Sequence, residues 1–180
     1  SRADRDWNWL LYVSFATVAS GVLARQPAGY TVAIVASEKN VIIPCALVQI
    51  MGRFPALDDH SEMGAFVWFL STAPDKALTS IPEYPISVDQ VPKRLGRIAL
   101  DVAVTHSLND RRSGRVALYA DEQGGDALVD WYCRCGMEVL SPNLRLPWVP
   151  RRLLKPSDGR YCYFTPPKAI EASRALDSLR

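Results

Sequence analysis

The chain has 180 residues, of which 48% are hydrophobic and 22% charged, and its formal net charge is +2. These ordinary globular values favour a single domain over residues 1–180, long enough to form a core without disulfide or metal staples. A net charge so close to zero argues neither for nor against a nucleic-acid partner.

The cysteines and an uncharged run near the amino terminus indicate in which cellular compartment the protein is expected. Cys45 and Cys162 sit in apolar runs and are expected to be buried. Cys133 and Cys135 lie two apart on a predicted helix, a spacing that suits neither a disulfide nor a zinc knuckle. The uncharged run Trp9–Ala24 is shorter than the roughly 20 residues of a membrane span. We therefore expect a cytoplasmic protein with reduced cysteines, no metal and no membrane.

The amino-terminal half is predicted to be mostly strands. Apolar spacing favours a helix from Trp7 to about Gly21, although alternation there leaves a strand open. The runs Tyr30–Ala36 and Val41–Met51, separated by a polar break, predict a hairpin. The aromatic and branched run Gly64–Ser71 predicts a central strand.

Helices and strands alternate after the proline-rich connector 74–92. We expect a helix over Leu95–Ser107, a strand over Arg115–Ala120 and a helix over Asp126–Cys135. The apolar face of the first helix is expected to comprise Leu95, Ile98, Ala99, Val102 and Ala103.

The last part repeats the alternation. A short run at Met137–Leu140 precedes a Pro/Arg-rich loop over 141–158 and a strand over Arg160–Thr165. Thr165 suits the N-cap of a final helix and Pro166 its first position. Ile170, Leu176 and Leu179 are predicted to share one side of that helix. The whole order indicates a mixed α/β (α+β) fold.

The segment Gly114–Met137 carries the most specific pattern. It reads as a strand, a Gly-Gly break, a helix with the pair Trp131-Tyr132, and a glycine stop. It resembles the acetyl-coenzyme A binding core of the GNAT superfamily of N-acetyltransferases. The family pattern F-Y-x-K/R-x-G-F matches Trp131, Tyr132, Arg134, Gly136 and Met137. The resemblance implies an acyl-CoA N-acyltransferase-like fold, with a central, mostly antiparallel sheet flanked by helices.

A basic helix start precedes this segment. Free N–H groups and the helix dipole favour an anion there, and Lys93, Arg94 and Arg97 add positive charge. The family's loop, Q/R-x-x-G-x-G/A, holds the coenzyme's pyrophosphate. With Gly96 as its final glycine, Arg94 takes the place of the first glycine. The resemblance thus implies coenzyme binding by Lys93, Arg94, Leu95, Gly96 and Arg97; the alternative is a solvated basic helix start.

The resemblance also assigns the pantetheine site and the chemistry. The pantetheine arm of acetyl-CoA, the co-substrate, would lie along Leu70, Ser71 and Thr72, where the family's strand splays from its neighbour. Tyr132 would protonate the departing thiolate after direct attack by a primary amine. The alternative for residues 70–72 is an ordinary core strand. The alternative for Tyr132 is a core residue without a catalytic role. Glu62, just before the strand, is the candidate general base.

The acceptor is left open by the sequence. We expect a small-molecule or peptide amine, selected by the connector 74–92 and the loop 141–158, and no nucleic acid. Two family positions, usually Asn and Ala, are Gly125 and Leu128 here. These departures favour the alternative function, a catalytically degenerate GNAT-fold binding or regulatory module. The oligomeric state is open, and a homodimer through exposed strand edges is one option.

Overall fold

The computed structural model describes residues 30–38, 41–74, 78–79, 93–146 and 157–177. The predicted amino-terminal helix, most of the connector 74–92 and residues 147–156 of the predicted loop lie outside the described residues. The elements, in chain order, are β1 (Tyr30–Glu38), β2 (Val41–Pro55), β3 (Met63–Thr72), α3 (Leu95–Asn109), β4 (Val116–Tyr119), the short 3₁₀ helix η2 (Glu122–Gly124), α4 (Gly125–Arg134), β5 (Glu138–Val139), β6 (Tyr161–Phe164) and α5 (Pro166–Arg174).

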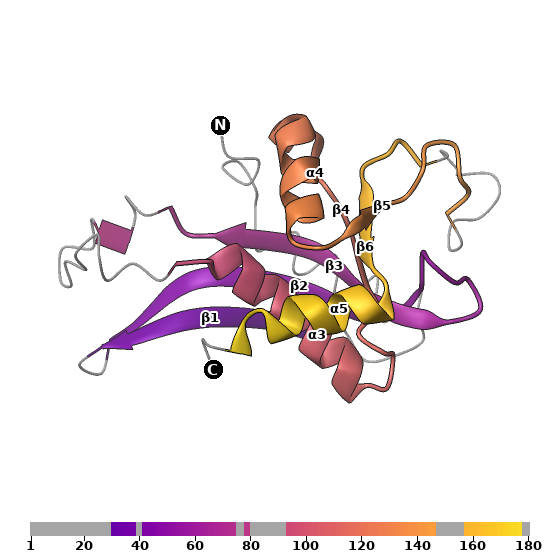
Figure 1. Ribbon diagram of the computed structural model, residues 1–180. Helices are drawn as coiled ribbons and strands as arrows, with labels where there is room; N and C mark the ends of the chain where they lie inside the picture. Colours follow the sequence, from indigo (N-terminus) through magenta and orange to yellow (C-terminus); the bar gives the residue numbers. More distant parts are fainter. Residues whose placement is uncertain (1–29, 39–40, 75–77, 80–92, 147–156, 178–180) are drawn as a thin grey trace.

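The strands form one six-stranded sheet in the order β1-β2-β3-β4-β6-β5 (Figure 1). Among the described strands, β3 and β4 pair in parallel and every other pairing is antiparallel. The helix α3 connects the parallel pair, as such a crossover requires. The mixed class, the mostly antiparallel sheet and the hairpin of β1 and β2 are therefore confirmed.

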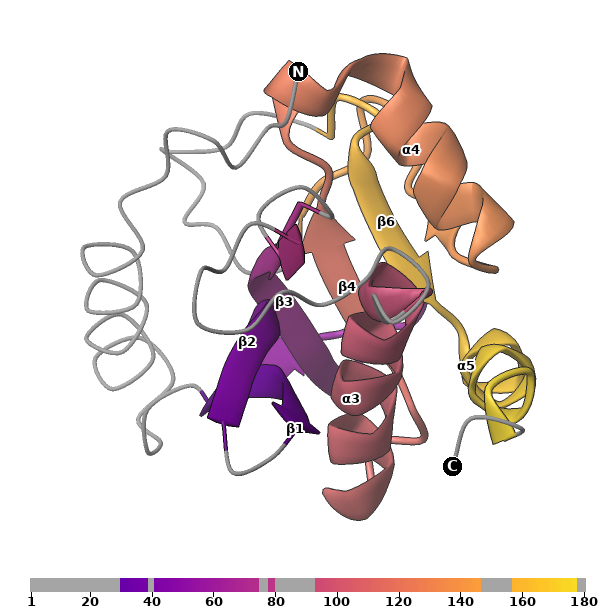
Figure 2. The same ribbon diagram turned by 90° about the vertical axis from the view of Figure 1, so that its left-hand side faces the viewer.

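The helices α3, α4 and α5 pack on the same side of the sheet (Figure 2). Their common core with the strands includes Val67, Leu118, Ala103 and Tyr132. A second cluster, with Phe54, Phe66 and Ala117, covers the opposite face. Neighbouring residues of β4 thus serve different cores, because successive side chains of a strand point to opposite faces.

The buried faces of α3 and α5 differ from the predicted ones. In α3 the buried residues are Leu95, Ala99, Leu100, Ala103, Val104 and Ser107, whereas Ile98 and Val102 are half-buried. The reason is that α3 contacts α5 as well as the sheet, which turns its buried stripe toward Leu100 and Val104. In α5, Ile170 is 39% exposed, whereas Ala169 and Ser173 are buried. Of the other residues predicted for this side, Leu176, just after α5, is buried, and Leu179 lies outside the described residues.

Cys45 and Cys162 are buried, as expected, and none of the four cysteines is part of a disulfide bond. Within the described part of the chain, no helix is both long enough and apolar enough to cross a membrane.

Candidate functional site

A β-bulge interrupts β3 at Trp68. Val67 lies opposite Ile50 of β2, but the next residue of β2, Gln49, lies opposite Phe69. Trp68 is therefore an extra residue in β3. As a result Val67 and Leu70, three residues apart, both pack into the helix-side core. Bulges of this kind disrupt a ladder locally and are common beside active sites.

The bulge coincides with the point where β3 and β4 separate. Their register pairs are Ala65–Val116, Phe66–Ala117 and Val67–Leu118, after which β3 continues beside β2 as far as Thr72. In Figure 1, β3 extends to the left with β2, whereas β4 and β6 run steeply through the other part of the sheet. The residues predicted for the pantetheine arm, Leu70, Ser71 and Thr72, thus lie beyond the last pair with β4. They are half-buried.

The helix α3 begins close to the end of β3. Lys93 and Arg94 form an exposed turn, and Arg94 has a φ of 64° at the N-cap without a side-chain capping bond. The first turn of α3 carries no acidic residue. Because the first N–H groups of a helix have no carbonyl inside the helix to bond, this end has anion-binding character.

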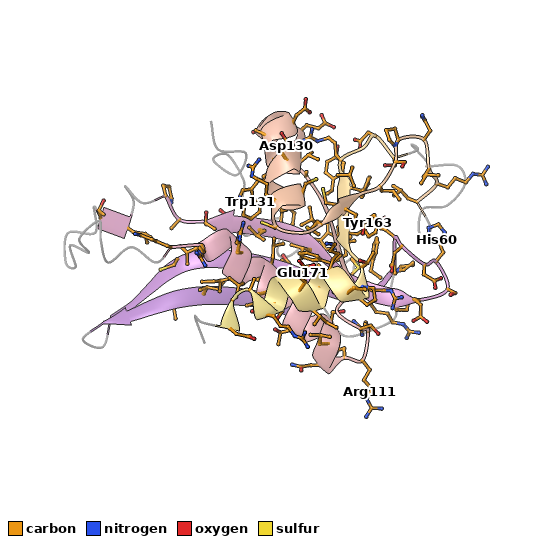
Figure 3. The ribbon with its side chains drawn as sticks, viewed as in Figure 1. His60, Arg111, Asp130, Trp131, Tyr163 and Glu171 are labelled. Atoms are coloured by element: carbon orange, nitrogen blue, oxygen red, sulfur yellow. The ribbon has the colours of Figure 1, made fainter. Side chains whose placement is uncertain are left out.

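Trp131 of α4 bridges the two helices at this end of the sheet (Figure 3). A Cβ built on Gly96 would lie 2.9 Å from Cη2 of Trp131 and 4.0 Å from Cγ2 of Thr72. The end of β3, the first turn of α3 and the aromatic pair of α4 therefore meet in one place. The structure brings together three sites that the sequence predicted separately.

Tyr132 lies next to this meeting point in the helix-side core. Its side chain is 6% exposed, and its ring packs edge-on to Trp131 with ring centroids 5.0 Å apart. Burial raises the pKa of Tyr132 above its usual value, and nearby Cys162 and Cys135 act in the same direction. The hydroxyl is protonated at neutral pH, as that of any ordinary tyrosine is, so it can donate a proton but cannot act as a base there.

Arg160 holds the turn between β4 and α4. Its Nε donates to the carbonyl oxygen of Ala120 at 2.7 Å, and its Nη2 donates to those of Asp121 at 2.7 Å and Gly125 at 3.0 Å. Its Nη1 also lies 3.7 Å from Oδ1 of Asp126. No local sequence signal marks this role, since the carbonyl groups that Arg160 binds lie 35 to 40 residues away.

Glu62 does not join this site, so its prediction as general base needs correction. It is exposed and lies before β3, with Oε2 4.0 Å from Nη1 of Arg115. Thr72 and Gly96 are at the other end of the ten-residue strand. At about 3.3 Å per residue, the two ends are roughly 30 Å apart. The described residues provide no replacement that the geometry favours.

Among the described residues, no group of three or more His, Cys, Asp and Glu side chains is arranged to hold a metal ion. Comparisons of the chain with protein-family models, curated proteins and solved structures give no match. Any function must therefore be argued from the site itself.

Proposed function

We propose that this protein is an acetyl-CoA-dependent N-acetyltransferase with an acyl-CoA N-acyltransferase-like fold. The observation that carries the proposal is that the parallel strands β3 and β4 separate at the bulge in β3, and that α3 begins with basic residues close to the end of β3. An extended ligand arm fits along a strand that leaves its neighbour, as in recognition by strand addition. A phosphate group fits the helix start that follows.

The conformation of Arg94 supports the match to the family's phosphate loop. Arg94 stands at the first glycine of the motif, and its φ of 64° is in the left-handed region that glycine adopts readily. The backbone thus has a glycine-like shape at that position even though the side chain differs. Lys93 and Arg97, both exposed, supply positive charge on either side.

In the proposed reaction, the nitrogen of a primary amine attacks the thioester carbonyl carbon. The carbon–sulfur bond breaks, and the departing thiolate of coenzyme A takes a proton from the hydroxyl of Tyr132. The proton of the amine nitrogen leaves to solvent, and the Tyr132 phenolate regains a proton from solvent, which restores the enzyme for the next turnover.

A second candidate is a non-catalytic module with the same fold. Two related observations favour it. Trp131 packs against Gly96, and the side chain of Tyr132 is buried, with 6% exposed. In that case both aromatic rings are core residues that join α3 and α4. The two candidates differ in whether a ligand ever reaches the tyrosine.

A thiol-release assay with acetyl-CoA and a panel of primary amines tests the proposal. The enzyme should release coenzyme A in the presence of at least one amine class, and Tyr132→Phe should slow that release. Coenzyme binding without release by any amine would favour the non-catalytic module. Absence of both, in a folded sample, would contradict the proposed function.

A further inference from the structure

A cavity lies on the helix side of the molecule, where α3, α5 and the end of α4 converge. Its volume is about 180 Å³. The cavity does not lie at the point where β3 and β4 separate. Of the site residues predicted from the sequence, Arg97 is the one that lines it. Ligand cavities for whole drug-sized molecules measure about 300–1,000 Å³. This cavity is therefore suited to one ring system of a larger ligand.

The floor of the cavity is apolar. Leu100 and Val104 of α3, Phe164 of β6 and Leu176, just after α5, line it, and each is at most 5% exposed. Such a floor favours a flat, weakly polar ring over a sugar or a flexible charged chain.

The rim of the cavity is charged, with three basic residues and two acidic ones. Lys168 and Glu171 of α5 pair with each other, Nζ to Oε2, at 3.2 Å (Glu171 is labelled in Figure 3). Arg97 donates from Nη2 to the carbonyl oxygen of Arg134 at 3.3 Å. The guanidinium of Arg134 itself is exposed at the mouth. The rim thus offers a net positive charge and guanidinium groups, which bind phosphate in a bidentate manner.

Arg97 links the cavity to the helix start described above. It belongs to the first turn of α3 and also lines the cavity. One helical turn advances about 5.4 Å, so a phosphate at the start of α3 would lie within a few ångströms of the cavity mouth. A ligand with a phosphate at the helix start and a ring several bonds away can therefore reach both.

We propose that this cavity receives the nucleotide end of coenzyme A. The adenine ring lies on the apolar floor, its 6-amino group donates toward the half-buried carboxylate of Asp101, and the 3′-phosphate binds Arg134 at the rim. This inference rests on the proposed function. It adds a subsite, formed with α5, that accounts for how the chain distinguishes coenzyme A from a simple acetyl thioester.

Calorimetric titration with adenosine 3′,5′-bisphosphate, which lacks the pantetheine arm, tests binding of the nucleotide end by itself. We expect the native protein to bind the bisphosphate, and to bind adenosine 5′-monophosphate at least roughly tenfold more weakly, because the charge-assisted contact of the 3′-phosphate is lost. The inosine analogue of the bisphosphate should also bind more weakly, because it lacks the amino group.

Two variants and one control complete the test. Arg134→Gln removes the rim charge at the surface, and Ala172→Phe fills the cavity from α5. Arg174→Gln, on the same helix but outside the cavity lining, is the matched control. We expect Arg134→Gln and Ala172→Phe to weaken binding of both the bisphosphate and acetyl-CoA, and Arg174→Gln to leave both unchanged.

The outcomes separate the inference from the proposed function. If acetyl-CoA binds the native protein and neither cavity variant alters that binding, the cavity assignment is overturned and the proposed function stands. If the bisphosphate binds and acetyl-CoA does not, the cavity is a nucleotide site and the proposed function fails. If neither binds, both fail.

Discussion

The indole of Trp131 lies against the position that a side chain on Gly96 would occupy. A Cβ on Gly96 would be 2.9 Å from Cη2 of the indole and 3.0 Å from Cζ2. Real Cβ atoms almost never approach a heavy atom so closely, so the glycine permits the two helices to meet. This contact joins the start of α3 to the helix that carries Tyr132, and the proposed site depends on it.

Replacement of Gly96 by alanine should destabilise the protein despite alanine's better helix propensity. The expected loss is about 1–2 kcal/mol, because the added methyl group forces Trp131 to move. In a Trp131→Ala background the same change should instead stabilise by about 0.5–1 kcal/mol, the propensity difference alone. Urea denaturation of the four proteins gives the coupling energy. Equal effects in both backgrounds would show that the contact is unimportant.

Arg94→Gly should make the protein more stable. A left-handed backbone costs a non-glycine residue about 1–2 kcal/mol, and part of this cost should be recovered. The control is Arg97→Gly, which places a glycine inside α3. This change should destabilise the folded protein by about 1 kcal/mol. Thermal unfolding followed by circular dichroism measures both. A loss of stability in Arg94→Gly would mean that its side chain makes a stabilising contact that outweighs the strain.

Tyr132→Phe should reduce acetyl transfer by about 100-fold or more, the usual contribution of a general acid, while barely altering acetyl-CoA affinity. The hydroxyl acts only on the departing thiolate, so the ground-state complex should not need it. The control is Tyr163→Phe, whose hydroxyl lies 3.2 Å from Oε2 of Glu138 on β5. Steady-state rates and calorimetry on both variants check this. Equal rates for Tyr132→Phe and the native enzyme would remove the tyrosine from the mechanism.

The raised pKa of Tyr132 predicts a loss of stability at alkaline pH. The folded protein holds the phenolic proton more tightly than the unfolded chain, so this stability is fully present below the ordinary tyrosine value of 10.0. Above that pH the unfolded chain releases the proton first. Stability should then fall by about 1.4 kcal/mol per pH unit on account of this one group. Tyr132→Phe should show a shallower decline in urea titrations between pH 9 and 11; an unchanged slope would contradict burial of the hydroxyl.

Arg160→Lys should loosen the turn between β4 and α4 although it preserves the charge. A lysine ammonium cannot reach the three carbonyl oxygens that the planar guanidinium bonds at once. We expect a loss of about 2–3 kcal/mol, because hydrogen bonds from charged groups contribute about 1.5–3 kcal/mol each and are not additive. Arg145→Lys, at an exposed position outside the helices and strands, is the comparison and should be neutral. Hydrogen exchange should also locate the change in α4.

The sequence predicted the elements well where their pattern is local. The strands β1 to β3 and the helices α3, α4 and α5 begin within about two residues of their expected positions. The pair Trp131-Tyr132 lies on the predicted helix and packs in the helix-side core. These features depend on side-chain periodicity, which neighbouring residues determine by themselves.

Features set by distant partners could not be predicted in the same way. The bulge at Trp68 exists only relative to the register of β2, and the last pair of β3 with β4, Val67–Leu118, lies just before it. Glu62 was misplaced because closeness to a strand in sequence does not say which end of that strand carries the site. Arg160 contacts a turn 35 to 40 residues earlier, so only the folded chain gives it a role.

The most direct test of the central claim is calorimetric titration of the native protein and Gly96→Asp with acetyl-CoA, with free coenzyme A for comparison. The proposed site predicts micromolar binding of both ligands by the native protein. It predicts no measurable binding by Gly96→Asp, because a carboxylate at the start of α3 repels phosphate and displaces Trp131. Absence of binding by a well-folded native protein, or equal binding by the variant, would contradict the account.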